Sequence, residues 1–183
     1  EITWGVFNEK ANRFANLLLQ RGVKKGDKVA ILMMNGLEWL PIYFGILKTG
    51  ALAVPLNFRY SSEEIEYCVN LAEVDVLVFS NAFIGRVEEI ADRISKGRLL
   101  IYVGEGCAGF ADDYNSLAAN CSSQNPNIEL CDDDNAAIYF SSGTISIISS
   151  ILQSSALQIF ASTSVLTLSF LPSFASAPVE IPD

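Results

Sequence analysis

Short apolar runs separated by amphipathic segments constrain the fold of this 183-residue chain more than any other feature. Val29–Met33 is apolar at every position, as a strand buried on both faces of a sheet should be. Between such runs, apolar residues recur three or four positions apart, which predicts helices with one buried face. The alternation continues to residue 103 and favours an α/β fold, with strand-helix units around a mostly parallel sheet and right-handed crossovers.

The apolar runs and the helical spacing of apolar residues also place the individual elements. We predict helices over Trp4–Gln20, Leu37–Lys48 and Tyr114–Ala119, one that starts at Ser61, and one with Phe83, Val87, Ile90 and Ile94 on its buried face. Leu40, Phe44 and Leu47 are the expected stripe of the second helix, and Pro55 marks a strand end or a sheet edge. We predict strands over Val29–Met33, Leu52–Leu56, Val74–Phe79, Leu99–Val103 and Ala136–Phe140.

The charge balance excludes several classes of function. A net charge of −9 argues against a nucleic-acid partner and against an anionic membrane surface, because both require a clustered basic face. The chain has no histidine, which excludes Ser-His and Cys-His catalysis and removes the commonest zinc ligand. Four cysteines stand far apart without a C-x-x-C pair, which is typical of free thiols in a reducing cytoplasm.

The stretch Asn135–Thr144 carries the strongest chemical signal, because an apolar run leads into two serines, a glycine and a threonine. Glycine lets a backbone approach a ligand closely, while hydroxyl and backbone N–H groups can converge on phosphate oxygens. Ligands of open α/β sheets bind beyond the carboxyl ends of strands, where this turn is expected. Taken alone, the stretch also fits a plain polar turn. Asp132–Asp134, just before it, is predicted to be a solvated acidic linker rather than a magnesium site.

Several ordered segments along residues 3–144 form recognisable patterns, among them Gly22–Leu32, Tyr43–Asn57 and Tyr139–Thr144. These segments resemble the adenylate-forming (AMP-binding) superfamily, and in particular its acyl-CoA synthetases. Gly22–Leu32 is similar to the family pattern G-V-x-K-G-D-x-V-A-I, and Tyr43–Asn57 to A-x-x-K-x-G-A-x-x-x-P-x-N. Tyr139–Thr144 is similar to the start of the family's phosphate loop, Tyr/Phe-Thr/Ser-Ser-Gly-Thr-Thr-Gly-x-Pro-Lys.

The resemblance implies an ATP-dependent, AMP-forming ligase that works in two steps. A carboxylate attacks the α-phosphate of Mg-ATP and releases pyrophosphate, and the thiol of CoA then displaces AMP from the acyl-adenylate. It also implies that Ser141, Ser142, Gly143 and Thr144 lie in the loop that holds the phosphates. ATP and Mg are the implied cofactors and CoA the co-substrate, while the carboxylate, whether acyl, aryl or amino acid, stays open. No catalytic and no metal-binding residue is assigned.

The resemblance stops at Thr144, because the family continues Thr-Gly-x-Pro-Lys and this chain continues Ile-Ser-Ile-Ile-Ser. We therefore divide the chain into residues 1–144, the N-terminal part of an AMP-binding domain, and residues 145–183, a divergent tail. Three interpretations of the tail are open: a membrane-spanning helix over Ile145–Leu171, a frameshifted or degenerate coding region, and an alternative segment that packs as helix or strand. The abrupt change of composition inside a motif favours the second.

Two functional hypotheses follow. The first is an N-terminal fragment of a carboxylate-activating ligase, located in the cytoplasm and inactive as an isolated chain. The alternative is a non-catalytic α/β pseudoenzyme or a binding and assembly fragment. Either hypothesis predicts an unpaired sheet edge and exposed apolar surface, which would promote self-association.

Overall fold

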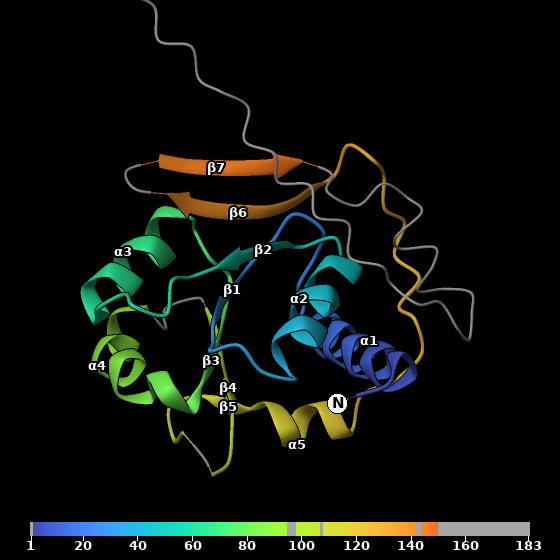
Figure 1. Cartoon of the computed structure of the whole chain (residues 1–183), viewed down its shortest axis with the longest axis horizontal. Coiled ribbons are helices and arrows are strands. Elements are labelled where there is room, and N and C mark those ends of the chain that lie inside the picture. Colours follow the sequence, from blue (N-terminus) through green and yellow to red (C-terminus); the bar gives the residue numbers. More distant parts are fainter. Residues whose placement is uncertain (1, 95–97, 107, 142–143, 150–183) are drawn as a thin grey trace, which may run out of the picture.

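A seven-stranded sheet with helices on both faces forms the framework of the protein (Figure 1). The computed structural model describes residues 2–94, 98–106, 108–141 and 144–149. The strands are β1 (Lys28–Leu32), β2 (Leu52–Pro55), β3 (Val76–Ser80), β4 (Leu99–Val103), β5 (Asp112–Asp113), β6 (Asn135–Ser141) and β7 (Thr144–Ser149). The helices are α1 (Trp4–Gln20), α2 (Trp39–Lys48), α3 (Ser62–Leu71), η1 (Asn81–Phe83), α4 (Ile84–Ile94) and α5 (Tyr114–Ala119).

The strand order is β5-β4-β3-β1-β2-β6-β7, and every neighbouring pair is parallel except β6 with β7. Strand β2 lies next to β1 on one side, and β3 lies next to β1 on the other side. This order confirms the predicted α/β fold with a mostly parallel sheet. It also brings the carboxyl ends of β1, β2, β3, β4 and β6 to the same end of the sheet, which we call its carboxyl edge. Open α/β sheets bind their ligands there.

Two apolar layers cover the sheet, and alternate residues of each central strand enter opposite layers. Ala30 and Leu32 pack beneath α3 and α4, whereas Val29 and Ile31 pack beneath α1, α2 and α5. All four side chains are buried, because a parallel strand in this position is covered on both faces. The continuous apolar run that first suggested the fold is thus explained by burial on two sides.

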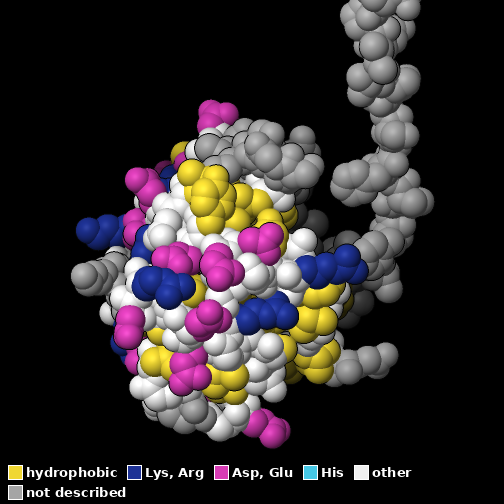
Figure 2. All heavy atoms as spheres, turned by 90° about the vertical axis from the view of Figure 1, so that its left-hand side faces the viewer, with side chains coloured by type: hydrophobic (Ala, Val, Ile, Leu, Met, Phe, Trp, Pro, Cys, Tyr) yellow, Lys and Arg dark blue, Asp and Glu magenta, His cyan; other side chains and the backbone are white. Residues whose placement is uncertain are grey.

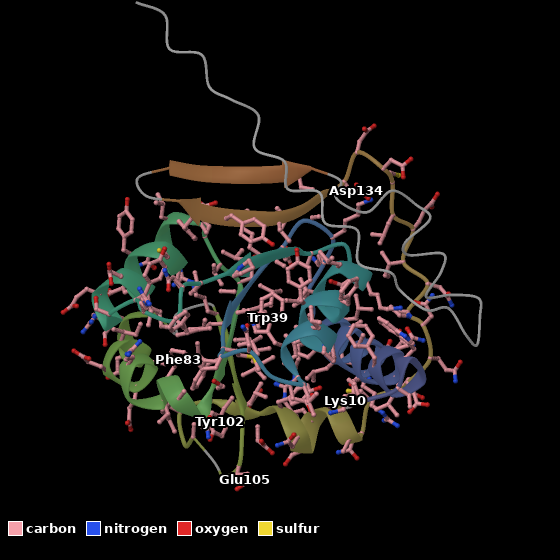
Figure 3. All side chains as sticks on the ribbon, in the orientation of Figure 1. Lys10, Trp39, Phe83, Tyr102, Glu105 and Asp134 are labelled. Carbon is pink, nitrogen blue, oxygen red and sulfur yellow. The ribbon has the colours of Figure 1, made fainter. Side chains whose placement is uncertain are left out.

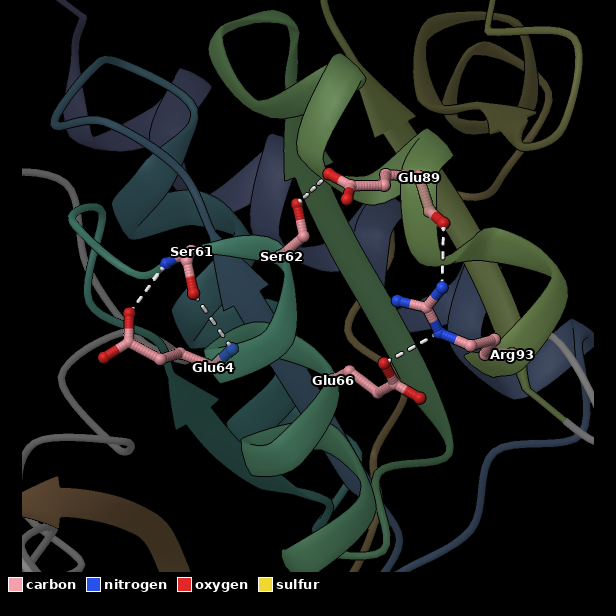
Figure 4. A network of polar contacts seen from close by, with 6 residues as sticks. All are labelled: Ser61, Ser62, Glu64, Glu66, Glu89 and Arg93. Carbon is pink, nitrogen blue, oxygen red and sulfur yellow. Dashed lines mark hydrogen bonds and ion pairs between the residues drawn. The ribbon is translucent and has the colours of Figure 1, made fainter.

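A polar network joins α3 to α4 on one face of the sheet (Figure 4). Ser61 and Glu64 form a capping box at the start of α3, in which the Ser61 backbone N–H donates to the Glu64 carboxylate at 2.8 Å. The Ser62 hydroxyl donates to Glu89 at 2.6 Å, and the Arg93 Nε donates to Glu66 at 2.8 Å. These contacts fix the helix start that the sequence predicted.

The surface of the α3–α4 side carries acidic and basic side chains interspersed, without a continuous basic patch in that view (Figure 2). All twelve Lys and Arg residues of the chain precede residue 99. Several are already paired with acids, as in Arg93 with Glu66 and Arg21 with Asp112.

Most predicted elements are confirmed, including α1 and α5 over their full predicted ranges. The predicted stripe of α2 is partly wrong, because Leu40 is 51% exposed while Ile42 and Ile46 are fully buried. Pro55 ends β2, as one alternative proposed, but β2 is an internal strand and not an edge. The two-residue strand β5 was not predicted.

The first residues of the tail form β7, which pairs antiparallel with β6. A membrane-spanning helix that starts at Ile145 is therefore wrong for residues 145–149, and residues 150–183 lie outside the described residues. None of the helices in the described part of the chain is long and apolar enough to cross a membrane. The proposed boundary between residues 144 and 145 stays a prediction.

Candidate functional site

The four residues predicted to hold phosphate fall at the junction of β6 and β7, at the carboxyl edge of the sheet. Ser141 ends β6 and Thr144 begins β7, and the two residues stand opposite each other in the antiparallel ladder. The sequence placed Ser141 in the turn itself, whereas the structure extends the strand through it. Ser142 and Gly143 lie outside the described residues, so only two residues join the paired strand ends.

A long connection, residues 120–134, carries the chain from α5 across α1 to β6 (Figure 1). Three polar residues on one side of α1 hold its first part. The Asn12 Nδ2 donates to the Ser123 carbonyl at 2.8 Å, and the Arg13 guanidinium donates to the Cys121 carbonyl at 2.6 Å. Asn16 donates to two further backbone carbonyls of the connection, those of Ser122 and Gln124. Side chains of α1 thus satisfy backbone acceptors that the irregular connection leaves without a regular partner.

The second anchor of the connection is Lys25, in the turn before β1. Its ammonium group lies 2.6 Å from the Asp134 carboxylate, and Asp134 also accepts the Cys131 backbone N–H at 2.7 Å. Figure 3 shows Asp134 at the entry to β6. The contact with Lys25 thus holds the end of the connection just before β6. Asp134 therefore belongs to a structural contact, although the sequence suggested a solvated linker.

This contact predicts a pH dependence of stability. The Cys131 N–H and the Lys25 ammonium hold the pKa of Asp134 below its ordinary value. Its ionised form therefore stabilises the folded state fully above the ordinary aspartate pKa, and this contribution disappears as the pH falls through the lowered pKa. Urea unfolding from neutral to acidic pH should show Asp134→Asn less stable than wild type near neutrality, with the difference shrinking below about pH 5.

Asp133→Asn is the matched control, since it removes the same charge at an exposed neighbouring position. Its effect on the free energy of unfolding should be small and should change little with pH. A pH-independent difference between wild type and Asp134→Asn would contradict the anchoring role of the ionised carboxylate.

Aromatic side chains of α2 lie beside β6, next to the candidate loop. The hydroxyl groups of Tyr43 and Tyr139 are 3.3 Å apart, and the Trp39 ring stacks on Tyr43 with centroids 5.3 Å apart. Burial, reinforced by the hydrogen bond to Tyr139, raises the pKa of Tyr43 above its ordinary value. Tyr43 therefore stays protonated near neutral pH and can act only as a neutral hydrogen-bonding group. The sequence did not single out these residues, because α2 is apolar or aromatic at nearly every position.

Few cations lie at the carboxyl edge of the sheet. Lys48, in the last turn of α2, is buried, and burial lowers its pKa. Since α2 returns from the carboxyl end of β1 to the amino end of β2, Lys48 lies at the opposite edge from the candidate loop. Lys10, labelled in Figure 3, is paired with Glu38. Arg86 donates to the Phe58 and Tyr60 carbonyls, and Arg59 lies over the Phe58 ring.

The described residues around the candidate loop do not by themselves form a Mg-ATP site. A phosphate-binding loop presents several successive unpaired backbone N–H groups, but here the strands pair up to Ser141 and Thr144. The sequence contains no Lys or Arg after Arg98 to balance phosphate charge. In the part of the chain that the structure describes, no three His, Cys, Asp or Glu side chains are grouped so that they could hold a metal ion. No catalytic step follows from these residues alone.

Two of the three cysteines that the structure describes are poor nucleophiles. Cys68 and Cys121 are buried free thiols, and burial raises the pKa of each. Cys131 is an exposed free thiol in the connection that leads to β6. Raised thiol pKa values oppose formation of the reactive thiolate, so the two buried cysteines have a packing role.

Comparison with known proteins identifies relatives of this chain. The family model described as "AMP-binding enzyme" matches residues 1–145. A medium/long-chain-fatty-acid–CoA/3-oxocholest-4-en-26-oate–CoA ligase of Mycolicibacterium smegmatis is 35% identical over 114 residues, covering 62% of this chain and 20% of the relative. A crotonobetaine/carnitine–CoA ligase of Proteus mirabilis is 33% identical over 151 residues, covering 80% of this chain and 29% of the relative.

The fold comparison agrees. The crystal structure of the anthranilate CoA ligase AuaEII in complex with anthranoyl-AMP superimposes with a TM-score of 0.71 at 26% identity, covering 75% of this chain and 26% of that one. The chain thus spans less than a third of the length of each of these relatives. The resemblance read from the ordered sequence segments is confirmed over the same region, and the chain belongs to the AMP-binding enzyme family.

Proposed function

We propose that this chain is the N-terminal part of an ATP-dependent, AMP-forming carboxylate–CoA ligase and has no ligase activity by itself. The observation that carries the proposal is the family match over residues 1–145, which includes β6 and the candidate loop after it. The named relatives are CoA ligases, and they are several times longer than the matched region.

In the proposed parent reaction, ATP activates a small-molecule carboxylate as its acyl-adenylate, and CoA then takes the acyl group. Mg would neutralise phosphate charge when bound, and the loop containing Ser141, Ser142, Gly143 and Thr144 would contact the phosphates. This chain provides the sheet edge on which such a loop is mounted, and β6 and the Tyr43–Tyr139 pair support that edge. The carboxylate itself is not specified, because the relatives act on fatty, sterol-derived, betaine and aromatic acids by name. The free thiols support a cytoplasmic location.

The second candidate function is a non-catalytic α/β module of the same ancestry. The pairing of Ser141 with Thr144 favours it, since a closed hairpin leaves little room for a phosphate-cradling loop. Both candidates predict the absence of turnover in the isolated chain. Only a ligase fragment could retain tight nucleotide affinity, whereas weak affinity is compatible with both candidates.

Isothermal titration with Mg-ATP tests for such affinity. We expect no binding tighter than millimolar, because the loop lacks the family's lysine and the chain lacks cations beyond residue 98. ATP–pyrophosphate exchange should likewise be absent, with an intact CoA ligase from the relatives as positive control. A micromolar dissociation constant would show that the described sheet edge retains a nucleotide site, and would favour the ligase fragment over the non-catalytic module.

A further inference from the structure

The two outermost strands of the sheet differ sharply in how readily another strand could pair with them. One edge is β5, two residues long and made of two aspartates, Asp112 and Asp113. The other is β7, six residues long with the sequence Thr-Ile-Ser-Ile-Ile-Ser and neither charge nor proline. Within the described ranges no strand pairs with the outer side of β7, which is the last strand of the sheet (Figure 1). Short charged edges resist strand addition, whereas long uncharged edges promote it.

The charge distribution also marks the β6–β7 hairpin as a place of contact. The chain carries a net charge of −9, so two copies repel each other over most of their surfaces. The whole stretch from Asn135 to Ser149 contains no charged residue, so two copies can approach here without that local repulsion. In the β6–β7 ladder, Ile147 stands opposite Ile138 and Ile145 opposite Phe140. A strand added outside β7 would therefore extend an apolar row that already crosses the hairpin.

We propose that β7 is a homodimerisation edge, at which two copies of this chain pair their β7 strands antiparallel about a two-fold axis at Ser146. In this register Ser146 of each copy faces its counterpart, and Ile145 faces Ile147 of the second copy. A register centred on Ile147 instead sets Ser146 against Ile148 and Ile145 against Ser149, which mixes polar with β-branched apolar residues. Matched β-branched cross-strand pairs stabilise a sheet, so the Ser146 register is preferred. A two-fold arrangement closes at the dimer.

Sedimentation velocity of the 183-residue chain over micromolar concentrations tests the proposal. Wild type should show a concentration-dependent monomer–dimer equilibrium. Ser146→Lys places two like charges directly opposite each other in the dimer, so the dissociation constant should rise by at least about tenfold. Asn70→Lys is the control, since it adds the same charge at an exposed position on α3, and it should leave the equilibrium unchanged.

A mixing experiment tests the two-fold geometry itself. Ser146→Asp should weaken self-association as Ser146→Lys does, whereas an equimolar mixture of the two variants should dimerise again, because opposite charges then face each other. A wild-type chain that stays monomeric at every concentration, as when residues 150–183 occupy the β7 edge, would overturn the proposal. So would a dimer or larger aggregate that Ser146→Lys leaves unchanged.

Cross-linking provides a readout that does not depend on charged variants folding. Residues directly opposite in an antiparallel pair have Cα atoms about 4.5–5.5 Å apart, within the range that a disulfide can bridge. Under mild oxidation Ser146→Cys should therefore form a covalent dimer on a non-reducing gel. Asn70→Cys, which carries the same four native cysteines, should not exceed the wild-type background. Equal cross-linking of both variants would contradict pairing at Ser146.

Discussion

Phe79→Ala is expected to lower the free energy of unfolding by about 3–5 kcal/mol, the cost typical of truncating a fully buried aromatic side chain. Phe79 lies on the internal strand β3 with no exposed surface. Its ring stacks on Phe110 with centroids 5.7 Å apart and contacts Tyr102 at the same centroid distance. Removing the ring leaves a cavity between the sheet and α4, because neighbours in a packed core relax only partly. Urea unfolding followed by tryptophan fluorescence measures the change.

Phe58→Ala is the matched control for this prediction. Phe58 is 47% exposed in the loop after β2, so the same substitution removes much less buried area there. Its effect on the free energy of unfolding should be clearly smaller, at most about 1.5 kcal/mol, because the ring is partly in solvent. If Phe79→Ala cost no more than Phe58→Ala, the packing of β3 beneath α4 would be wrong.

Gly45→Ala is expected to destabilise the protein by about 1–3 kcal/mol, because it overpacks the contact between α1 and α2. A Cβ atom at position 45 would lie 2.8 Å from the Ala11 carbonyl oxygen and 2.9 Å from the Phe14 Cδ1. The first neighbour is backbone and cannot rotate away, so the two helices would have to separate. That movement would also displace Trp39 and Tyr43, which support β6, and a loss of near-ultraviolet circular dichroism should accompany the loss of stability.

Gly85→Ala provides the control with the same chemical change. Gly85 lies in the first turn of α4, and a Cβ atom there has nothing within 4 Å. Alanine should therefore raise stability by up to about 1 kcal/mol through helix propensity alone. Opposite signs for the two substitutions would confirm that the α1–α2 distance, and not glycine content, sets the outcome. Stabilisation by Gly45→Ala would refute the close helix contact.

Local sequence patterns predicted most of the elements. The apolar run at β1 and the capping residues at Ser61 each depend on neighbours a few positions away, and both were placed correctly. The buried side of α2 was not predicted, because a helix with apolar or aromatic residues on nearly every side has no period that selects one face. Only packing against α1 shows that Ile42 and Ile46 face the core and Leu40 does not.

The features of the candidate site also divide into those that the sequence predicts and those that it does not. Its motif, its place after a buried strand and its family follow from the sequence, because residue types and their spacing are enough to recognise them. The contacts that hold β6 do not follow from the sequence, since Asn12 and Ser123 are 111 positions apart and Lys25 and Asp134 are 109 positions apart. No periodicity links residues so distant along the chain. Residue types and their spacing are therefore enough to specify the α/β architecture and its ancestry. The anchoring of β6 and its pairing with β7 emerge only from the folded structure, because those contacts exist only once the chain has folded.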